Sequence, residues 1–245
     1  MRRLLVISCA LAIGSVAAAT LYWFFLNTPE SNALMLIVSA LLAMALVGVV
    51  AVTVNTAVLV ARGAPTRSAV AMASRGTGWF LVAVTPLLVA RWAIGRGDEW
   101  IISHQGEINA WLMAQFGWAD ITRLLQAEVW VSLWLRWTLL PVITLSLLAA
   151  LLTSEVRQSG WWRRAWRWHT LLVTTAVFIL LFALPWQLTG WRPQVPPTWI
   201  EPLAAGLRLG AVFLLALIGA VVMIVVSVRP APGGGSGPSN RRQHD

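Results

Sequence analysis

Residues 33–60 read ALMLIVSALLAMALVGVVAVTVNTAVLV and contain no charged side chain. A hydrocarbon core about 30 Å thick needs about 20 consecutive apolar residues for one helical crossing. The run is therefore long enough to span a bilayer as a helix. It is also longer than the buried helices of most soluble domains.

Comparable apolar runs occur on both sides of this segment, and the composition agrees with them. Hydrophobic residues make up 58% of the 245-residue chain and charged residues only 11%. A soluble globule does not have this balance. We therefore predict an all-α fold, a polytopic transmembrane helix bundle of about six spans. The predicted spans are residues 4–26, 33–60, 77–95, 130–152, 169–188 and 202–228.

The N-terminus resembles a secretory signal peptide, because Arg2 and Arg3 precede an apolar run that includes the small residues Ala17–Ala19. The run continues as far as Leu26, however, which gives it the length of a full crossing. We expect an uncleaved first span. The count of six depends on its retention.

The least apolar part of the membrane region lies between the third and fourth spans. Ile108, Trp111, Leu112 and Phe116 recur there at helical spacing, which is typical of a short amphipathic helix in the interface. Asp120 is the expected N-cap of a second helix, which starts at Ile121 and continues into the fourth span. Residues 1–229 are thus one transmembrane domain, and residues 230–245, rich in Gly, Pro and Ser, form a disordered cytoplasmic tail.

The distribution of arginine predicts the orientation. All 18 basic residues are arginines, which weakly favours a bacterial source, and the formal net charge is +9. If the N-terminus is cytoplasmic, twelve arginines fall on the cytoplasmic side. The other six are Arg91, Arg96, Arg123, Arg136, Arg192 and Arg208. The positive-inside rule then predicts a multi-pass protein of the bacterial inner membrane with both termini in the cytoplasm.

A Trp/Arg cluster follows the fourth span. Stacking on single-stranded nucleic acid is one use of such a mixture, but indole and guanidinium groups also favour the headgroup zone. We expect interfacial anchoring, with anionic cytoplasmic lipids as partners and no nucleic acid. The predicted anchors are Trp161, Trp162, Arg163, Arg164, Trp166, Arg167 and Trp168.

Three arginines fall inside predicted spans, about 6 to 9 Å from the outer boundary at the rise of an α-helix. Charges at this depth must snorkel, pair or line a wet cavity. Glu128, Ser132 and Arg136 are spaced four apart and share one helix face. Either the arginines snorkel to the outer headgroups and pair with Glu128 and Glu201 for structure, or they converge on an anionic substrate from the extracytoplasmic side; we favour the structural interpretation. The candidate outer-face polar cluster is Arg91, Glu128, Arg136, Glu201 and Arg208.

Catalytic and cofactor patterns are weak in this sequence. His104 and Glu107 lie near Asp98 and Glu99, but no second histidine supports a metal site, so we expect a solvated segment and no cofactor. Gly206 and Gly210 form a small-xxx-small pair, which permits close helix approach. We prefer packing inside the bundle, with a homo-oligomer or another membrane protein as the alternative.

These patterns leave three functional hypotheses. The first is a non-enzymatic integral membrane component or assembly partner. The second is a small transporter, or an anion- or lipid-handling protein, that uses the outer arginines. The third is a membrane-embedded enzyme acting at the outer leaflet. Neither a polar path through both leaflets nor convergent acid/base residues at one face are evident in the sequence, so we favour the first.

Overall fold

The computed structural model describes residues 1–29, 31–117, 122–153, 167–180, 184 and 200–228, and every regular element in these ranges is helical. Within these ranges five helices are long and apolar enough to cross a membrane, and a shorter apolar helix, α9 (Trp168–Phe178), covers the first part of the predicted fifth span. The all-α polytopic membrane fold is therefore confirmed. The predicted tail, residues 230–245, lies outside the described residues.

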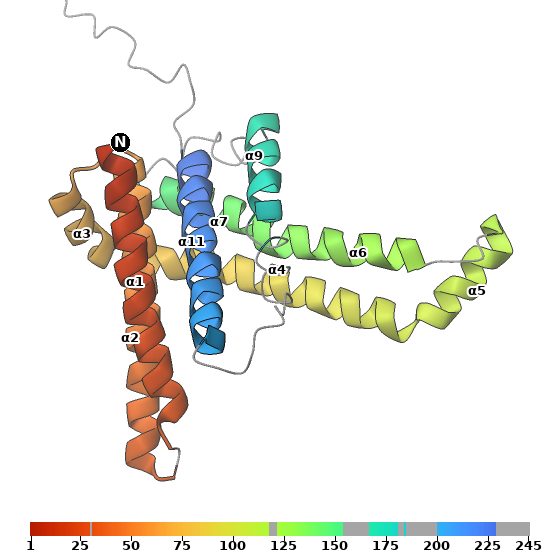
Figure 1. The fold of residues 1–245 in the computed structure, drawn as a ribbon, viewed down its shortest axis with the longest axis horizontal. Helices are drawn as coiled ribbons and strands as arrows, with labels where there is room; N and C mark the ends of the chain where they lie inside the picture. Colours follow the sequence, from red (N-terminus) through yellow and green to blue (C-terminus); the bar gives the residue numbers. More distant parts are fainter. Residues whose placement is uncertain (30, 118–121, 154–166, 181–183, 185–199, 229–245) are drawn as a thin grey trace, which may run out of the picture.

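Helices α1 (Arg2–Asn27) and α2 (Ala33–Ala61) form an antiparallel pair that matches the first two predicted spans (Figure 1). The Asn32 side chain caps α2 by accepting a hydrogen bond of 2.9 Å from the backbone N–H of Met35. The cap satisfies one of the backbone donors that an isolated helix start leaves unpaired. It explains why α2 begins immediately after the polar turn.

A short helix, α3 (Thr66–Arg75), occupies the loop that was predicted between the second and third spans. It is joined to α2 by a tight turn at Gly63, where φ is +101°. The buried Asn55 of α2 donates a hydrogen bond of 3.2 Å to the carbonyl oxygen of Ala73. That carbonyl belongs to the last turn of α3, where intrahelical partners are missing, so Asn55 ties α3 to the span.

Helix α4 (Thr77–Ser103) continues eight residues beyond the predicted end at Gly95. The sequence Gly95-Arg96-Gly97 looked like a boundary, but glycine weakens a helix without preventing it. After His104 the chain forms α5 (Gln105–Phe116), which ends at Gly117 in the left-handed conformation. A helix is therefore present where the interfacial helix was predicted. Leu112 is its buried residue, whereas Trp111 and Phe116 are exposed; the predicted cap, Asp120, lies outside the described residues.

The fourth span consists of α6 (Thr122–Trp134), the π-helical segment η1 (Leu135–Leu139) and α7 (Leu140–Leu152). In η1 the N–H of Leu140 donates to the carbonyl oxygen of Leu135, five residues back. Pro141 explains this widening, since it has no N–H and its ring crowds the carbonyl group four residues earlier. The span thus carries a π-turn just before Pro141.

Figure 1 shows two groups of helices. Helices α1, α2 and α11 (Ile200–Val228) lie together, and the hairpin of α4, α5 and α6 runs across their direction and extends away from them. The largest buried cluster joins the groups where α7 and the start of α4 pack on α1, α2 and α11. It includes Ile7, Val58, Ala83, Leu148 and Ile224.

The surfaces of the long helices are mostly unburied within the chain. In the most apolar stretch of each candidate span, the buried share of the residues ranges from 11% to 39%. The rest of this apolar surface is too large to face water, which is the pattern of a helix in lipid. The protein is therefore a multi-pass membrane protein.

Candidate functional site

The best-connected polar group in the described ranges joins α4 to the fourth span. Arg136 of η1 forms an ion pair with Asp98 of α4 through Nη2 and Oδ2. Ser132 of α6 donates to the same carboxylate, at 2.9 Å from Oδ2 and 3.1 Å from Oδ1. The Arg136 and Asp98 side chains are 23% and 26% exposed, so solvent weakens the attraction between their charges only in part.

Helical register explains why these groups meet. Arg91, Gly95 and Asp98 are spaced at i, i+4 and i+7 on α4, and Glu128, Ser132 and Arg136 are spaced four apart on the fourth span. The two rows face each other in the hairpin. A Cβ added to Gly95 would lie 3.7 Å from Nη2 of Arg136, an ordinary van der Waals distance, so the guanidinium group of Arg136 passes close to α4 at this position.

Arg91 contributes to the same hairpin through an aromatic ring. Its guanidinium carbon lies 4.3 Å from the ring centroid of Trp137, which is the geometry of a cation–π contact. The neighbouring Trp134 donates from its indole N–H to the hydroxyl of Thr175 in α9 at 3.1 Å. The segment around η1 thus connects α4 on one side with α9 on the other.

Glu128, on the same face of the fourth span as Arg136, interacts electrostatically with both Asp98 and Arg136. We had expected the arginines to pair with Glu128 and Glu201. The ion pair is instead formed with Asp98 on α4. The hairpin centre therefore holds two arginines, Arg91 and Arg136, and two carboxyl groups.

The remaining two residues of the predicted outer-face cluster lie on α11. Arg208 donates from Nε to the carbonyl oxygen of Ala204, one turn earlier, at 3.4 Å. Glu201 is exposed in the first turn of α11. The structure thus places Arg91, Glu128 and Arg136 together in the hairpin, and Arg208 and Glu201 on a different helix.

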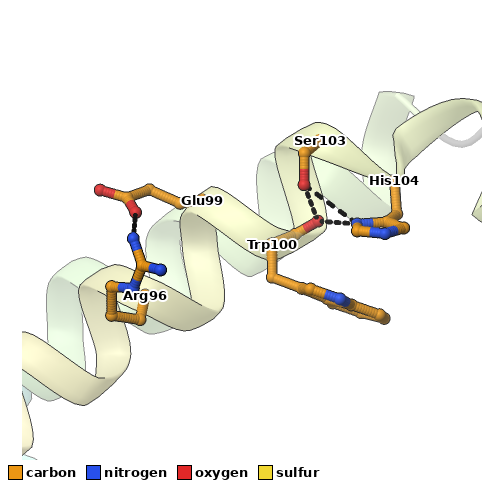
Figure 2. A network of polar contacts seen from close by, with 5 residues as sticks. All are labelled: Arg96, Glu99, Trp100, Ser103 and His104. Atoms are coloured by element: carbon orange, nitrogen blue, oxygen red, sulfur yellow. Dashed lines mark hydrogen bonds and ion pairs between the residues drawn. The ribbon is translucent and has the colours of Figure 1, made fainter.

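The polar residues at the end of α4 interact with one another (Figure 2). Arg96 forms an exposed ion pair of 2.7 Å with Glu99. His104 Nδ1 lies 2.9 Å from the carbonyl oxygen of Trp100, and the two rings stack with centroids 4.7 Å apart. A carbonyl oxygen can only accept, so Nδ1 carries the proton. In the described part of the chain, no three His, Cys, Asp or Glu side chains are grouped to hold a metal ion.

Two other predicted features have different outcomes. Of the Trp/Arg cluster, Arg167 and the exposed Trp168 are seen at the start of α9, whereas Trp161, Trp162, Arg163, Arg164 and Trp166 lie outside the described residues. A Cβ added to Gly206 or Gly210 would meet nothing within 4 Å. Among the described residues nothing packs on this glycine pair, so its place inside the bundle stays a prediction.

Asp98 is the residue of this group that the sequence analysis missed. We placed it in an extramembrane segment because the third span was expected to end at Gly95. The sequence feature that could have revealed it is the seven-residue spacing between Arg91 and Asp98. In a continuous helix this spacing places both side chains on the same face. Trp137 was missed because cation–π contacts between helices leave no local sequence pattern.

No protein-family model, curated protein or solved structure matches this chain. Its function is therefore inferred from its own residues and their geometry.

Proposed function

We propose that the protein is a non-enzymatic integral membrane component with a structural or assembly role, in which charged side chains near the ends of its spans join its helices. The observation that carries the proposal is the contact of Asp98 with both Ser132 and Arg136. Charges inside a membrane protein are costly unless they pair. Here the pairing holds α4 against the fourth span.

The charge balance supports this role over anion handling at the hairpin. Arg91 and Arg136 are matched in number by Asp98 and Glu128, so the four groups together have no formal excess of positive charge. An anion-binding site needs such an excess to repay the desolvation of its ligand. A net-neutral group is better suited to holding two helices together.

We also propose the inner membrane of a bacterium as the location, with both termini in the cytoplasm. One end of the molecule gathers the start of α1, the α2–α3 turn and the end of α11 (Figure 1). Arg2, Arg3 and Arg62 lie at this end, and α3 adds Arg67 and Arg75. By the positive-inside rule this end faces the cytoplasm.

Single cysteines introduced into a Cys9→Ser chain test the orientation, since Cys9 is the only native cysteine. A cysteine at Ser68 in α3 should resist a membrane-impermeant thiol reagent in intact cells and react after permeabilisation. A cysteine at Gln105 of α5, in the connection between α4 and α6, should react in intact cells. The reverse pattern would overturn the proposed orientation.

A charge exchange tests the structural role. Asp98→Arg alone and Arg136→Asp alone should each lower the yield of monodisperse, membrane-inserted protein, because each leaves two like charges facing each other. The double variant restores opposite charges and should recover most of that yield. Normal yield for both single variants would contradict the structural role.

A matched exchange at Arg96 and Glu99 provides the control. This pair has the same chemistry but is two-thirds exposed and lies within one helix. Water and salt screen such pairs, so neither single variant should change the yield. An equal loss at both sites would mean that the yield reports charge changes in general and not the contact between helices.

A further inference from the structure

A cavity of about 410 Å³ lies between the first turns of α1 and the turn that connects α2 to α3. Arg2, Arg3 and Val6 line it from α1, and Val60, Gly63 and Thr66 line it from the opposite side. Its volume falls within the range of about 300 to 1,000 Å³ that is usual for small-ligand pockets. It is therefore large enough for a polar headgroup.

The turn that forms one wall is specified by the sequence. The N–H of Gly63 donates to Val60 and the N–H of Ala64 donates to Leu59, each at 3.0 Å, which is the Schellman arrangement at a helix end. Gly63 has a φ of +101°, a conformation that suits glycine. A Cβ there would lie 3.4 Å from Nη1 of Arg3, so the guanidinium group rests over the turn.

In the described part of the chain, the helices that border the cavity bring no acid to offset its positive charge. Helices α1, α2 and α3 contain no acidic residue. Helix α3 adds a second positive feature, since its N-cap is Pro65 and no side chain caps its first N–H groups. The arginines and the positive end of the helix dipole thus attract an anion from the same side.

The depth of the cavity indicates where such an anion resides. Helix α1 begins at Arg2 and helix α2 ends at Ala61, and both are long enough to cross the membrane. The cavity therefore lies where two spans end, at the level of the lipid headgroups. Basic pockets between span ends are suited to anionic headgroups, because the phosphate group of a membrane lipid already lies at this depth.

We propose that this cavity is a binding site for the phosphate group of an anionic membrane lipid, held by Arg2 and Arg3 against the α2–α3 turn. The site is independent of the Asp98–Arg136 contact and does not rest on the proposed structural role. Apolar Val6 and Val60 accommodate the part of the headgroup that adjoins the acyl chains.

The experiment titrates the full chain, purified in a neutral detergent, with phosphatidylglycerol and counts bound lipids by native mass spectrometry. Arg2→Gln/Arg3→Gln should weaken binding about tenfold or more, given about 1 kcal/mol for each arginine near an anionic headgroup. Arg67→Gln/Arg75→Gln removes the same charge from the same end outside the cavity and should change binding by less than about threefold. Equal losses in the two double variants would overturn the proposal.

Two further arms decide the outcome. Thr66→Trp fills the cavity without removing charge and should also weaken binding; unchanged binding in this variant would overturn the site even if the arginine variant fails to insert. Inorganic phosphate should compete only weakly with phosphatidylglycerol. If it binds as tightly and needs the same arginines, the site takes free phosphate and the lipid proposal is wrong.

Discussion

Arg136 and Asp98 form an ion pair between two helices although they are 38 positions apart in the chain. Ser132, one turn before Arg136, donates to the same carboxylate, so Asp98 receives two partners from one face of the fourth span. The pair explains how a membrane helix carries an arginine in its π-helical segment, because Asp98 of α4 supplies the opposite charge.

A double-mutant cycle with Asp98→Asn and Arg136→Gln should show a favourable coupling of about 1 to 3 kcal/mol, between the values for exposed and for buried ion pairs. Removing one partner leaves the other charge unpaired. The losses of unfolding free energy in the two single variants should therefore add up to more than the loss in the double variant. Thermal unfolding in a neutral detergent measures the coupling. The same cycle at Arg96 and Glu99 should give only a few tenths of a kcal/mol, and an equal value at both pairs would contradict a special role for Asp98.

Gly14→Ala should destabilise the contact of α1 with α2 by about 1 to 3 kcal/mol, as overpacking does in a tight interface. A Cβ at Gly14 would overlap the side chain of Thr53 and lie only 2.8 Å from its Cβ, which rotation of the side chain cannot move away. Gly48→Ala is the matched control, since nothing lies within 4 Å there. The prediction fails if both variants unfold at the same temperature as the parent protein.

Asn55→Ala should lower the free energy of unfolding by about 1 to 2 kcal/mol, the typical loss when a buried hydrogen-bond partner is removed. The change leaves the Ala73 carbonyl oxygen at the end of α3 without its side-chain donor. Thr85→Ala is the control, because the Thr85 hydroxyl bonds only to Leu81 of its own helix at an exposed position. Unfolding in detergent, followed by tryptophan fluorescence, distinguishes the two variants.

Gly206→Leu combined with Gly210→Leu should leave the fold of one chain intact, since no described residue lies within 4 Å of a Cβ at either position. If this face of α11 associates with a second copy, the added side chains will hold the helices apart and weaken the association. Energy transfer between labelled chains in vesicles measures association. A variant with leucine at both Gly48 and Gly78 is the control, since nothing lies within 4 Å of a Cβ at either position. Loss of folded monomer would show that the glycines pack within the chain after all.

Much of the fold was predictable because its signals are local. A charge-free run such as 33–60 specifies a membrane helix by length alone, and Asn32 specifies where that helix starts. The end of α4 was not predictable in the same way. Gly95 and Gly97 lower helix propensity. The helix nevertheless continues, because unpaired backbone N–H and C=O groups cost more free energy in a membrane than the two glycines do.

By itself, then, the sequence determined that the chain crosses a membrane several times and which residues begin and end most of its helices. Only the tertiary structure decided that Asp98 pairs with Arg136, that Arg3 lies over Gly63, and that no described residue packs on Gly206 or Gly210. The physical reason is range. Helix length, capping and hydrophobicity act over a few neighbouring residues, whereas ion pairs and cavities form between segments that meet only after the helices have packed.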